Sequence, residues 1–177
     1  MFGSLVAAAG LASIVLAPGS AQAQAQAQAA PCSTPEYRQL DFWAGDWGLE
    51  FDQQNGGVGT GTNRITKDEY GSCVITEHFA MPGGFSGVSV SIYDPQLRTW
   101  RQTWVDNAGG VFVLTGGPVT GQDHIFEMRT VDRGPSGANR RMIWQDVTAD
   151  RLTWRWQRET TEGQWVDMWV IRYRKRA

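Results

Sequence analysis

Few side chains in this sequence have the type and spacing for catalysis, and Glu77 is the strongest candidate. It lies in residues 73–80, CVITEHFA, on the apolar face of an alternating pattern. A carboxyl group in apolar surroundings has a raised pKa, which suits proton transfer near neutral pH. Glu77 and Asp106 could meet as a carboxyl pair inside the fold. We favour instead a structural ion pair in which Arg64, from the preceding strand, bridges Glu77.

Other catalytic and metal-binding patterns are weak. His78 and His124 are the only histidines, and His78 follows Glu77 directly, so the two point to opposite faces of a strand and cannot hold one ion together. No Gly-x-Ser-x-Gly nucleophile motif is present, and the glycines mark turns rather than a phosphate-binding loop. We therefore expect no metal ion and no cofactor. Haem with His78 or His124 as its ligand is the alternative.

Tryptophan is unusually abundant, with nine residues in the chain, seven of them in expected strands of the second half. Several polar residues share faces with them: Gln102 lies between two tryptophans, and Asp167 lies between Trp165 and Trp169. A polar group on an apolar face needs a partner or a polar ligand. The pattern indicates either a large aromatic core or an apolar cavity with a few polar groups.

If there is a cavity, alternation predicts which side chains face it. Three tryptophans would line it, three polar residues would orient the polar end of a ligand, and one tyrosine beside the Asp94-Pro95 turn would close the mouth. An error of one residue in register would move each of them to the outer face. In that order the predicted residues are Trp104, Trp144, Trp154, Gln102, Asn63, Glu77 and Tyr93.

The elements that position these residues are short strands separated by Gly, Pro, Asn and Asp turns. Such strands at intervals of about 8–12 residues are typical of an antiparallel barrel or sandwich. Closure removes exposed edges, so we predict an all-β, up-and-down barrel of about ten strands, with a two-sheet sandwich as the alternative. A short helix beginning near Ser33 and ending before Gly45 precedes them. The expected strands are residues 47–54, 59–68, 73–80, 85–94, 98–106, 110–116, 123–131, 140–148, 151–159 and 164–174.

The N-terminal residues predict export. Residues 1–30 contain an apolar run followed by an Ala-Gln repeat with small-x-small cleavage sites, as in a signal peptide and linker, although no basic residue precedes the run. One barrel domain, residues 31–177, would follow, located in the periplasm or secreted. A membrane anchor is the alternative, and we expect no stable one. The formal net charge of −2 gives no electrostatic reason to expect nucleic acid as a partner.

Cys32 and Cys73 are the only cysteines. In an exported protein two cysteines usually pair. This disulfide would tie the N-terminal segment to an interior strand and close a loop of about 40 residues, which the chain-entropy estimate values at roughly 3–4 kcal/mol. The alternative is two unrelated buried thiols.

The segment DFWAGDW, residues 41–47, carries a resemblance to known families. Gly45-Asp46-Trp47 resembles the Gly-x-Trp signature of the calycins, the lipocalin-like barrels. That resemblance implies a short lead-in helix, with Trp47 as a plug at the closed end. An arginine of the last strand, Arg172 or Arg174, would stack on its ring.

A longer resemblance covers nearly all of residues 31–177. The segment DFWAGDW, together with GTNRI, GSC, EH, YD and WRQTWVD further along, is similar to a family of uncharacterised exported bacterial proteins. It implies the barrel and brings no established activity.

Three functions remain open from the sequence. The first is an exported barrel that binds a small apolar or amphiphilic molecule. The second is an enzyme of the same fold, an isomerase, lyase or hydrolase, with Glu77 as acid or base. The third is a structural protein with a filled core, which would have no cavity.

Overall fold

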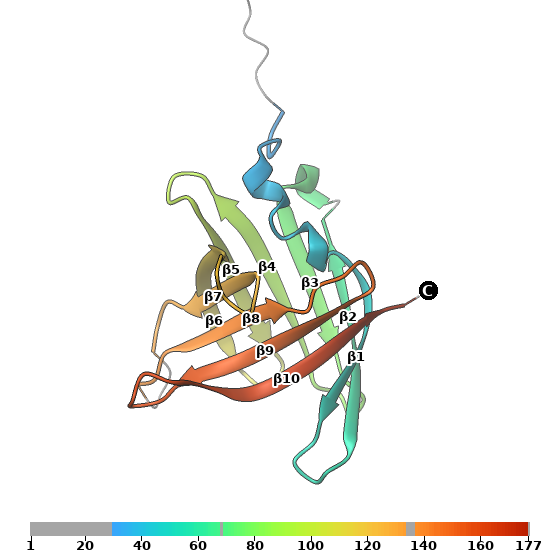
Figure 1. Ribbon diagram of the computed structural model, residues 1–177. Coiled ribbons are helices and arrows are strands. Elements are labelled where there is room, and N and C mark those ends of the chain that lie inside the picture. Colours follow the sequence, from blue (N-terminus) through green and yellow to red (C-terminus); the bar gives the residue numbers. More distant parts are fainter. Residues whose placement is uncertain (1–29, 68, 134–136, 177) are drawn as a thin grey trace, which may run out of the picture.

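Ten antiparallel strands close into one barrel in the computed structural model, which describes residues 30–67, 69–133 and 137–176 (Figure 1). Each strand pairs with its neighbours in sequence, and β1 pairs with β10 to close the ring. The predicted up-and-down barrel is confirmed, and the sandwich alternative was wrong. The strands are β1 (Gly45–Asp52), β2 (Val58–Thr66), β3 (Val74–Ala80), β4 (Ser86–Asp94), β5 (Thr99–Asp106), β6 (Val111–Pro118), β7 (Phe126–Thr130), β8 (Arg140–Gln145), β9 (Arg151–Glu159) and β10 (Trp165–Lys175).

Alternation along the strands places large apolar side chains inside the barrel. In β5, Trp100 and Gln102 are buried while Arg101 and Thr103 are exposed. The exception is β10, where the register shifts between Asp167 and Trp169. This bulge turns Asp167 outward. Its carboxylate accepts a hydrogen bond from Gln157 Nε2 at 2.9 Å and pairs with Arg155, so the prediction that it shares the apolar face was wrong.

The N-terminal segment covers one end of the barrel as two short 3-10 helices rather than one helix (Figure 1). These are η1 (Pro35–Arg38) and η2 (Asp41–Trp43). Leu40, between them, is completely buried, and Trp43 is 1 % exposed. The Trp100 indole in β5 also donates to Gln39 Oε1 at 3.1 Å. The segment is therefore a packed cap on the barrel.

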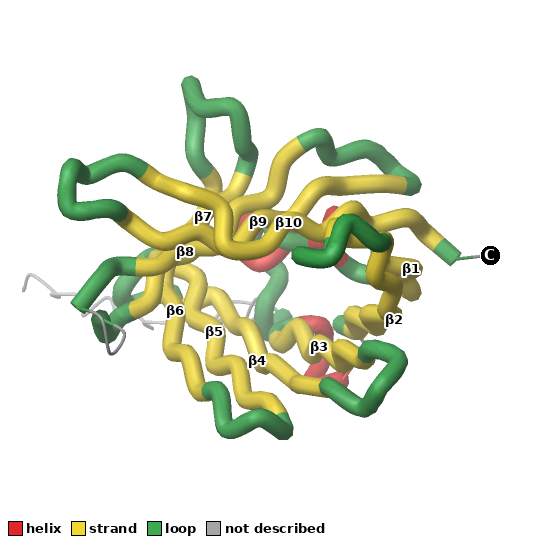
Figure 2. Tube along the Cα trace, turned by 90° about the horizontal axis from the view of Figure 1, so that it is seen from below, coloured by secondary structure: helices red, strands yellow, loops and turns green. Residues whose placement is uncertain are grey.

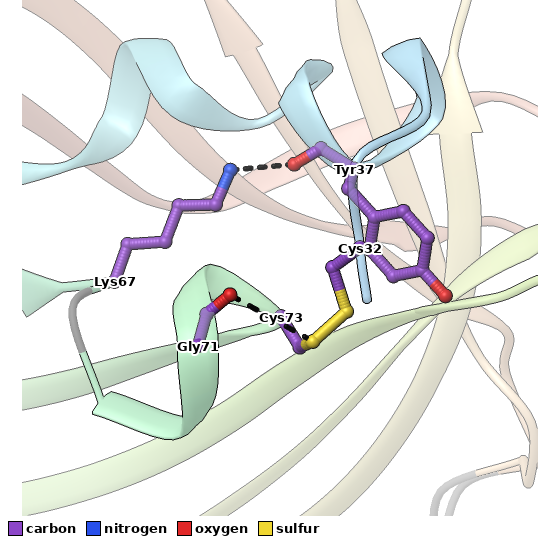
Figure 3. The surroundings of a disulfide bond; sticks show 5 residues. All are labelled: Cys32, Tyr37, Lys67, Gly71 and Cys73. Carbon is purple, nitrogen blue, oxygen red and sulfur yellow. Dashed lines mark hydrogen bonds between the residues drawn. A yellow bond between two sulfur atoms is a disulfide. The ribbon is translucent and has the colours of Figure 1, made fainter. Parts of the chain in front are cut away.

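The predicted disulfide between Cys32 and Cys73 is present and fastens this cap (Figure 3). Cys73 follows the 3-10 turn η3 (Glu69–Ser72) and directly precedes β3. Lys67, at the end of β2, adds a second attachment because its ammonium donates to the Tyr37 carbonyl and pairs with Asp41. Covalent and ionic contacts thus hold the same cap to the same corner of the barrel.

Trp47 fills the capped end of the interior, and its surroundings explain Gly45. The Trp47 indole donates to the Trp43 carbonyl at 2.8 Å, and Lys175 Nζ lies 5.1 Å from the ring centroid. Gly45 has φ +143°, and a Cβ there would lie 2.8 Å from Lys175 Cε. Glycine therefore allows both the backbone turn and the passage of the lysine stem.

The cation over Trp47 is thus a lysine, and the prediction of Arg172 or Arg174 was wrong. The register pairs Trp47 with Lys175, and alternation then turns Arg172 outward. There its guanidinium donates to both carboxylate oxygens of Asp52, at 2.8 and 3.3 Å.

The predicted signal peptide and linker fall almost entirely on residues 1–29, outside the described residues. Among the segments that are described, no helix has the length and apolar character to cross a bilayer. The disulfide is consistent with an oxidising, exported location.

Replacing both Cys32 and Cys73 with serine should lower the free energy of unfolding by about 3–4 kcal/mol, because the closed loop no longer restricts the unfolded chain. Urea denaturation followed by tryptophan fluorescence measures this change. Wild-type protein treated with a thiol reductant should reach the same stability, and the double variant should not respond to the reductant. Equal stability of oxidised wild type and double variant would contradict the role given to the bond.

Candidate functional site

The interior of the barrel contains a cavity of about 140 Å³. Figure 2 views the barrel from the end opposite η1 and η2. Trp43, from η2, belongs to the wall, so the cavity reaches the N-terminal cap. Nine of the fifteen lining side chains are aromatic. The lining residues are Trp43, Glu77, Phe79, Phe85, Gln102, Trp104, Asp106, Phe112, Leu114, Met142, Trp154, Trp156, Trp169, Ile171 and Tyr173.

The aromatic walls meet at steep angles. The Phe79 ring stands at 74° to Trp104 and at 73° to Trp169, with centroids 6.0 and 5.8 Å apart. Trp154 stands at 87° to Trp169 and stacks parallel to Trp156. Edge-to-face contacts of this kind lock each ring against the next. The cavity therefore has rigid, perpendicular aromatic sides.

A glycine makes room for one of these walls. Gly87 in β4 lies beneath the Trp104 indole, and a Cβ at this position would lie 2.2 Å from Trp104 Cζ2. The sequence Ser86-Gly87-Val88 thus keeps β4 free of a side chain where β5 supplies a tryptophan. The indole N–H of Trp104 donates to Asp106 Oδ2 at 2.9 Å, which fixes the ring orientation.

Glu77 forms the centre of a buried polar network on one wall. Its carboxyl group accepts hydrogen bonds from Asn63 Nδ2 at 2.7 Å and from the Ser89 hydroxyl at 2.6 Å. Asn63 Nδ2 also donates to the Tyr173 hydroxyl at 3.0 Å. Glu77 is 6 % exposed, and every hydrogen-bond partner named here is uncharged.

Gln102 extends the network along β4 and β5. Its Nε2 donates to the hydroxyls of Ser89 and Ser91, at 3.0 Å each. All three side chains are buried. Because the Ser89 hydroxyl links Gln102 to Glu77, this network holds the carboxyl group in one orientation.

Burial raises the pKa of Glu77 to about 7, and the hydrogen bonds from Ser89 and Asn63 oppose that rise only in part. The predicted ion pair with Arg64 was wrong. Arg64 lies on the outer face, and its Nε is 3.8 Å from an Asp46 carboxylate oxygen. Strand pairing explains this, since Ile65 is opposite Glu77 and Arg64 is opposite His78.

Asp106 lines the same cavity but makes different contacts. Burial alone would raise its pKa, but hydrogen bonds from the Trp104 indole and from the Gly110 and Ala108 backbone hold the pKa of Asp106 below its usual range. No direct contact joins it to Glu77 among the described residues. Ser89 of β4 is opposite Glu77 of β3 on one side and opposite Trp104 of β5 on the other. Asp106 lies two residues further along β5 than Trp104. The cavity therefore carries two carboxyl groups at different depths.

Some buried polar atoms in this region have no partner within the described part of the chain. They are Asn63 Oδ1, Trp43 Nε1 and Trp144 Nε1. Tyr173 accepts from Asn63, and burial, followed by the nearby charge of Glu77, raises its pKa. The Tyr173 hydroxyl is therefore a neutral group at the cavity wall throughout the physiological pH range.

The structure brings four of the seven predicted ligand-binding residues to the cavity wall: Glu77, Gln102, Trp104 and Trp154. Asn63 lies one hydrogen bond behind the wall. The remaining two are elsewhere. Trp144 packs against Trp43, with centroids 5.4 Å apart. Tyr93 packs against Tyr37 in the cap and does not belong to the cavity lining.

Sequence reasoning missed several lining residues, chiefly Trp43, Phe79, Trp169 and Tyr173. Phe79 shares the face of Glu77 two residues away, so the same alternation identifies it. Trp169 and Tyr173 follow the bulge in β10, which the sequence does not mark. Trp43 enters from the cap and has no strand periodicity to reveal it.

Neither histidine is placed to hold a haem in this cavity. His78 is exposed on the outer face of β3. His124 is buried, but its ring nitrogens contact Asp123 and Glu127, at 2.9 and 3.1 Å. Neither residue lines the cavity, so the haem alternative lacks its axial ligand. The described residues contain no group of three or more His, Cys, Asp or Glu side chains that could hold a metal ion.

Comparison with known proteins identifies a family. The profile of DUF1579, described as a protein of unknown function, matches residues 33–175. The chain belongs to the DUF1579 family. The match covers the cap and all ten strands of the barrel. A search of curated proteins finds no match.

Among solved structures, the DUF1579 chain is similar to Rv2717c from M. tuberculosis. The two share 12 % sequence identity with a TM-score of 0.52, over 81 % of this chain and 99 % of the other. At this identity the likeness supports the barrel fold alone.

The Glu77 pKa predicts a specific dependence of stability on pH. Since its pKa is about 7 in the fold and about 4.3 in an unfolded chain, the folded state holds a proton that the unfolded state releases between these values. The free energy of unfolding should therefore fall by about 3 kcal/mol as the pH rises from 4 to 7, and change little from this group above 8.

Glu77→Gln should remove this fall, because glutamine stays neutral. Urea denaturation of wild type and variant at pH 5 and pH 8 measures the difference. Glu50→Gln is the matched control, since Glu50 is exposed on β1. If wild type and Glu77→Gln lost equal stability over this range, Glu77 would not be the buried carboxyl group described here.

Proposed function

We propose that this DUF1579 barrel binds a small, largely apolar or amphiphilic molecule in its cavity. The observation that carries the proposal is the composition of the cavity lining, which combines many aromatic side chains with one small group of polar side chains. Aromatic side chains form most of the lining, and the Glu77 network supplies a few fixed polar groups at one place. This is the usual composition of a small-molecule site.

Cavity size limits the ligand. A cavity of about 140 Å³ is close to the ~150 Å³ apolar cavity that accommodates benzene in an engineered protein. The ligand should therefore be similar in size to benzene or slightly larger, with about six to ten non-hydrogen atoms. A filled core, the third possibility from the sequence, is less well supported because the cavity exists.

Several finer statements belong to the same proposal. Residues 1–30 would be a signal peptide with its linker, which leaves residues 31–177 as an exported barrel in the periplasm or outside the cell, without a membrane anchor or nucleic-acid partner. The disulfide and the net charge of −2 support this placement. Membership of the calycins would rest on Gly45 and Trp47, with Lys175 in place of the expected arginine.

The direct test is native mass spectrometry of the mature protein purified from its source, followed by denaturation. A reproducible extra mass lost on denaturation supports the binding function. Trp104→Ala should then weaken binding of the released compound about tenfold or more, because Trp104 lines the cavity. Trp165→Ala is the control, since Trp165 lies beneath Arg141 outside the cavity. Unchanged affinity in Trp104→Ala would contradict the site.

Acid–base catalysis is the second candidate function, favoured by the cavity-facing Glu77 with a pKa of about 7. In this case Glu77 would take a proton from carbon next to the carbonyl group of a bound ketone. Exchange of cyclopentanone hydrogens for deuterium, followed by NMR, should be accelerated by wild type and by Glu50→Gln but not by Glu77→Gln. Equal exchange rates with wild type and Glu77→Gln would remove this candidate.

A further inference from the structure

We propose that the ligand of this cavity is a small organic ammonium ion, because two carboxyl groups and aromatic rings line the cavity and no cationic side chain of the described residues does. This inference rests on the proposed binding function and specifies the chemical class of its ligand.

The charged side chains in the described lining of the cavity are all acidic. Among the residues that the structure describes, Glu77 and Asp106 are the only ionisable side chains in the lining besides Tyr173, and no Lys, Arg or His belongs to it. Two cations contact aromatic rings close by without belonging to the lining: Arg140 lies over the ring of the lining residue Phe112, 5.6 Å from its centroid, and Lys175 covers Trp47. A buried carboxylate without a cation is costly in a protein interior. An ammonium ligand would supply the missing partner.

The aromatic lining suits the same ligand. Only three of the fifteen lining residues are aliphatic, and nine are aromatic. Faces of indole and phenyl rings attract cations, and the attraction strengthens when the site excludes water. The perpendicular arrangement of Phe79, Trp104 and Trp169 makes the sides of a box, the form in which proteins hold alkylated ammonium groups.

Other ligand classes fit less well. An anion would meet the negative charge of Asp106 and the negative faces of the rings, with no cation to receive it. A neutral apolar molecule would fill the volume, but it would give ionised Glu77 no counter-charge and would therefore favour the protonated form of the group. The aromatic wall and the carboxyl network together therefore favour a cation with apolar substituents over both.

The groups facing Glu77 set the pH dependence of this binding. Asn63 from β2 and Ser89 from β4 are neutral donors. Tyr173 from β10 stays neutral because its pKa is raised, and Asp106 from β5 stays ionised because its pKa is lowered. Glu77 is thus the group that changes charge near pH 7. An ammonium ligand favours ionised Glu77, so its binding should release a proton below this pH.

The test compares matched pairs of probes by isothermal titration calorimetry with the full mature protein. Choline and 3,3-dimethylbutan-1-ol have the same shape, but a carbon replaces the charged nitrogen in the second. Phenyltrimethylammonium and tert-butylbenzene form a second matched pair, larger than the first but still within the size that the cavity volume allows. At pH 8 we expect each ammonium to bind at least about tenfold more tightly than its neutral counterpart.

Variants and pH identify the cause of that preference. As the pH is lowered below 7, the affinity of wild type for choline should decrease, approaching a tenfold decrease for each pH unit. The proton that Glu77 releases on binding is taken up by the buffer, so the measured binding heat should depend on the buffer used. Glu77→Gln should bind choline at least tenfold more weakly at pH 8 and lose the pH dependence, whereas Glu50→Gln should behave as wild type. Far-UV circular dichroism checks that each variant is folded. Trp154→Leu keeps an apolar side chain but removes the indole ring. It should weaken the binding of choline more than the binding of 3,3-dimethylbutan-1-ol.

Each outcome decides between the proposals. Ammonium preference that depends on Glu77 supports the inference. Equal or tighter binding of the neutral probes overturns it and leaves the binding function standing. Failure of both ammonium probes, with binding of neutral probes, also overturns the inference alone. If no probe of either series binds and native mass spectrometry finds no ligand, the inference and the proposed binding function both fail.

Discussion

The pairing of β1 with β10 is the constraint on which the rest of the molecule depends. It closes ten strands into a ring, so every second residue of each strand faces one shared interior. The chain fills most of this space with aromatic rings, and glycines such as Gly59 and Gly87 leave room for them. One end is then sealed by the cap, which a disulfide and Lys67 fasten. The unfilled remainder is the cavity, a consequence of closure around side chains that cannot pack completely.

Closure also explains the unusual state of Glu77. A carboxyl group inside a closed barrel cannot turn to water, and alternation sends the arginine of the neighbouring strand to the outer face. Within the described part of the chain only neutral donors, Asn63 and Ser89, hydrogen-bond to it. These bonds offset part of the effect of burial, and the pKa of Glu77 is about 7. The outer surface of β7–β10 offers a contrast. There Glu127 is also largely buried, but it pairs with Arg129 and Arg141, and the pKa of Glu127 is lowered. The interior carboxyl thus differs from an ordinary buried ion pair.

Sequence alone predicted the faces of the strands but not the depth of each residue along the barrel. Alternation correctly turned Trp104, Trp144 and Tyr93 inward, yet only Trp104 reaches the cavity, because depth follows from the stagger between strands. The expectation of Arg64 beside Glu77 failed for a simpler reason. Asn63 and Arg64 are adjacent in β2, so an inward Asn63 requires an outward Arg64. The sequence also did not reveal that Lys175, rather than Arg172, lies over Trp47. That position depends on the register between β1 and β10, which no sequence pattern marks.

The ionisation of Glu77 in the folded, ligand-free protein tests most directly the claim that the cavity holds a carboxyl group without a counter-charge. Carbon-13 NMR of the Glu77 carboxyl group, followed from pH 4 to pH 9 and identified by its absence in Glu77→Gln, measures this pKa. We predict a midpoint near 7. A midpoint near 4.3, the value of a solvated glutamate, would show that water or a cation reaches the group and would contradict the site described here.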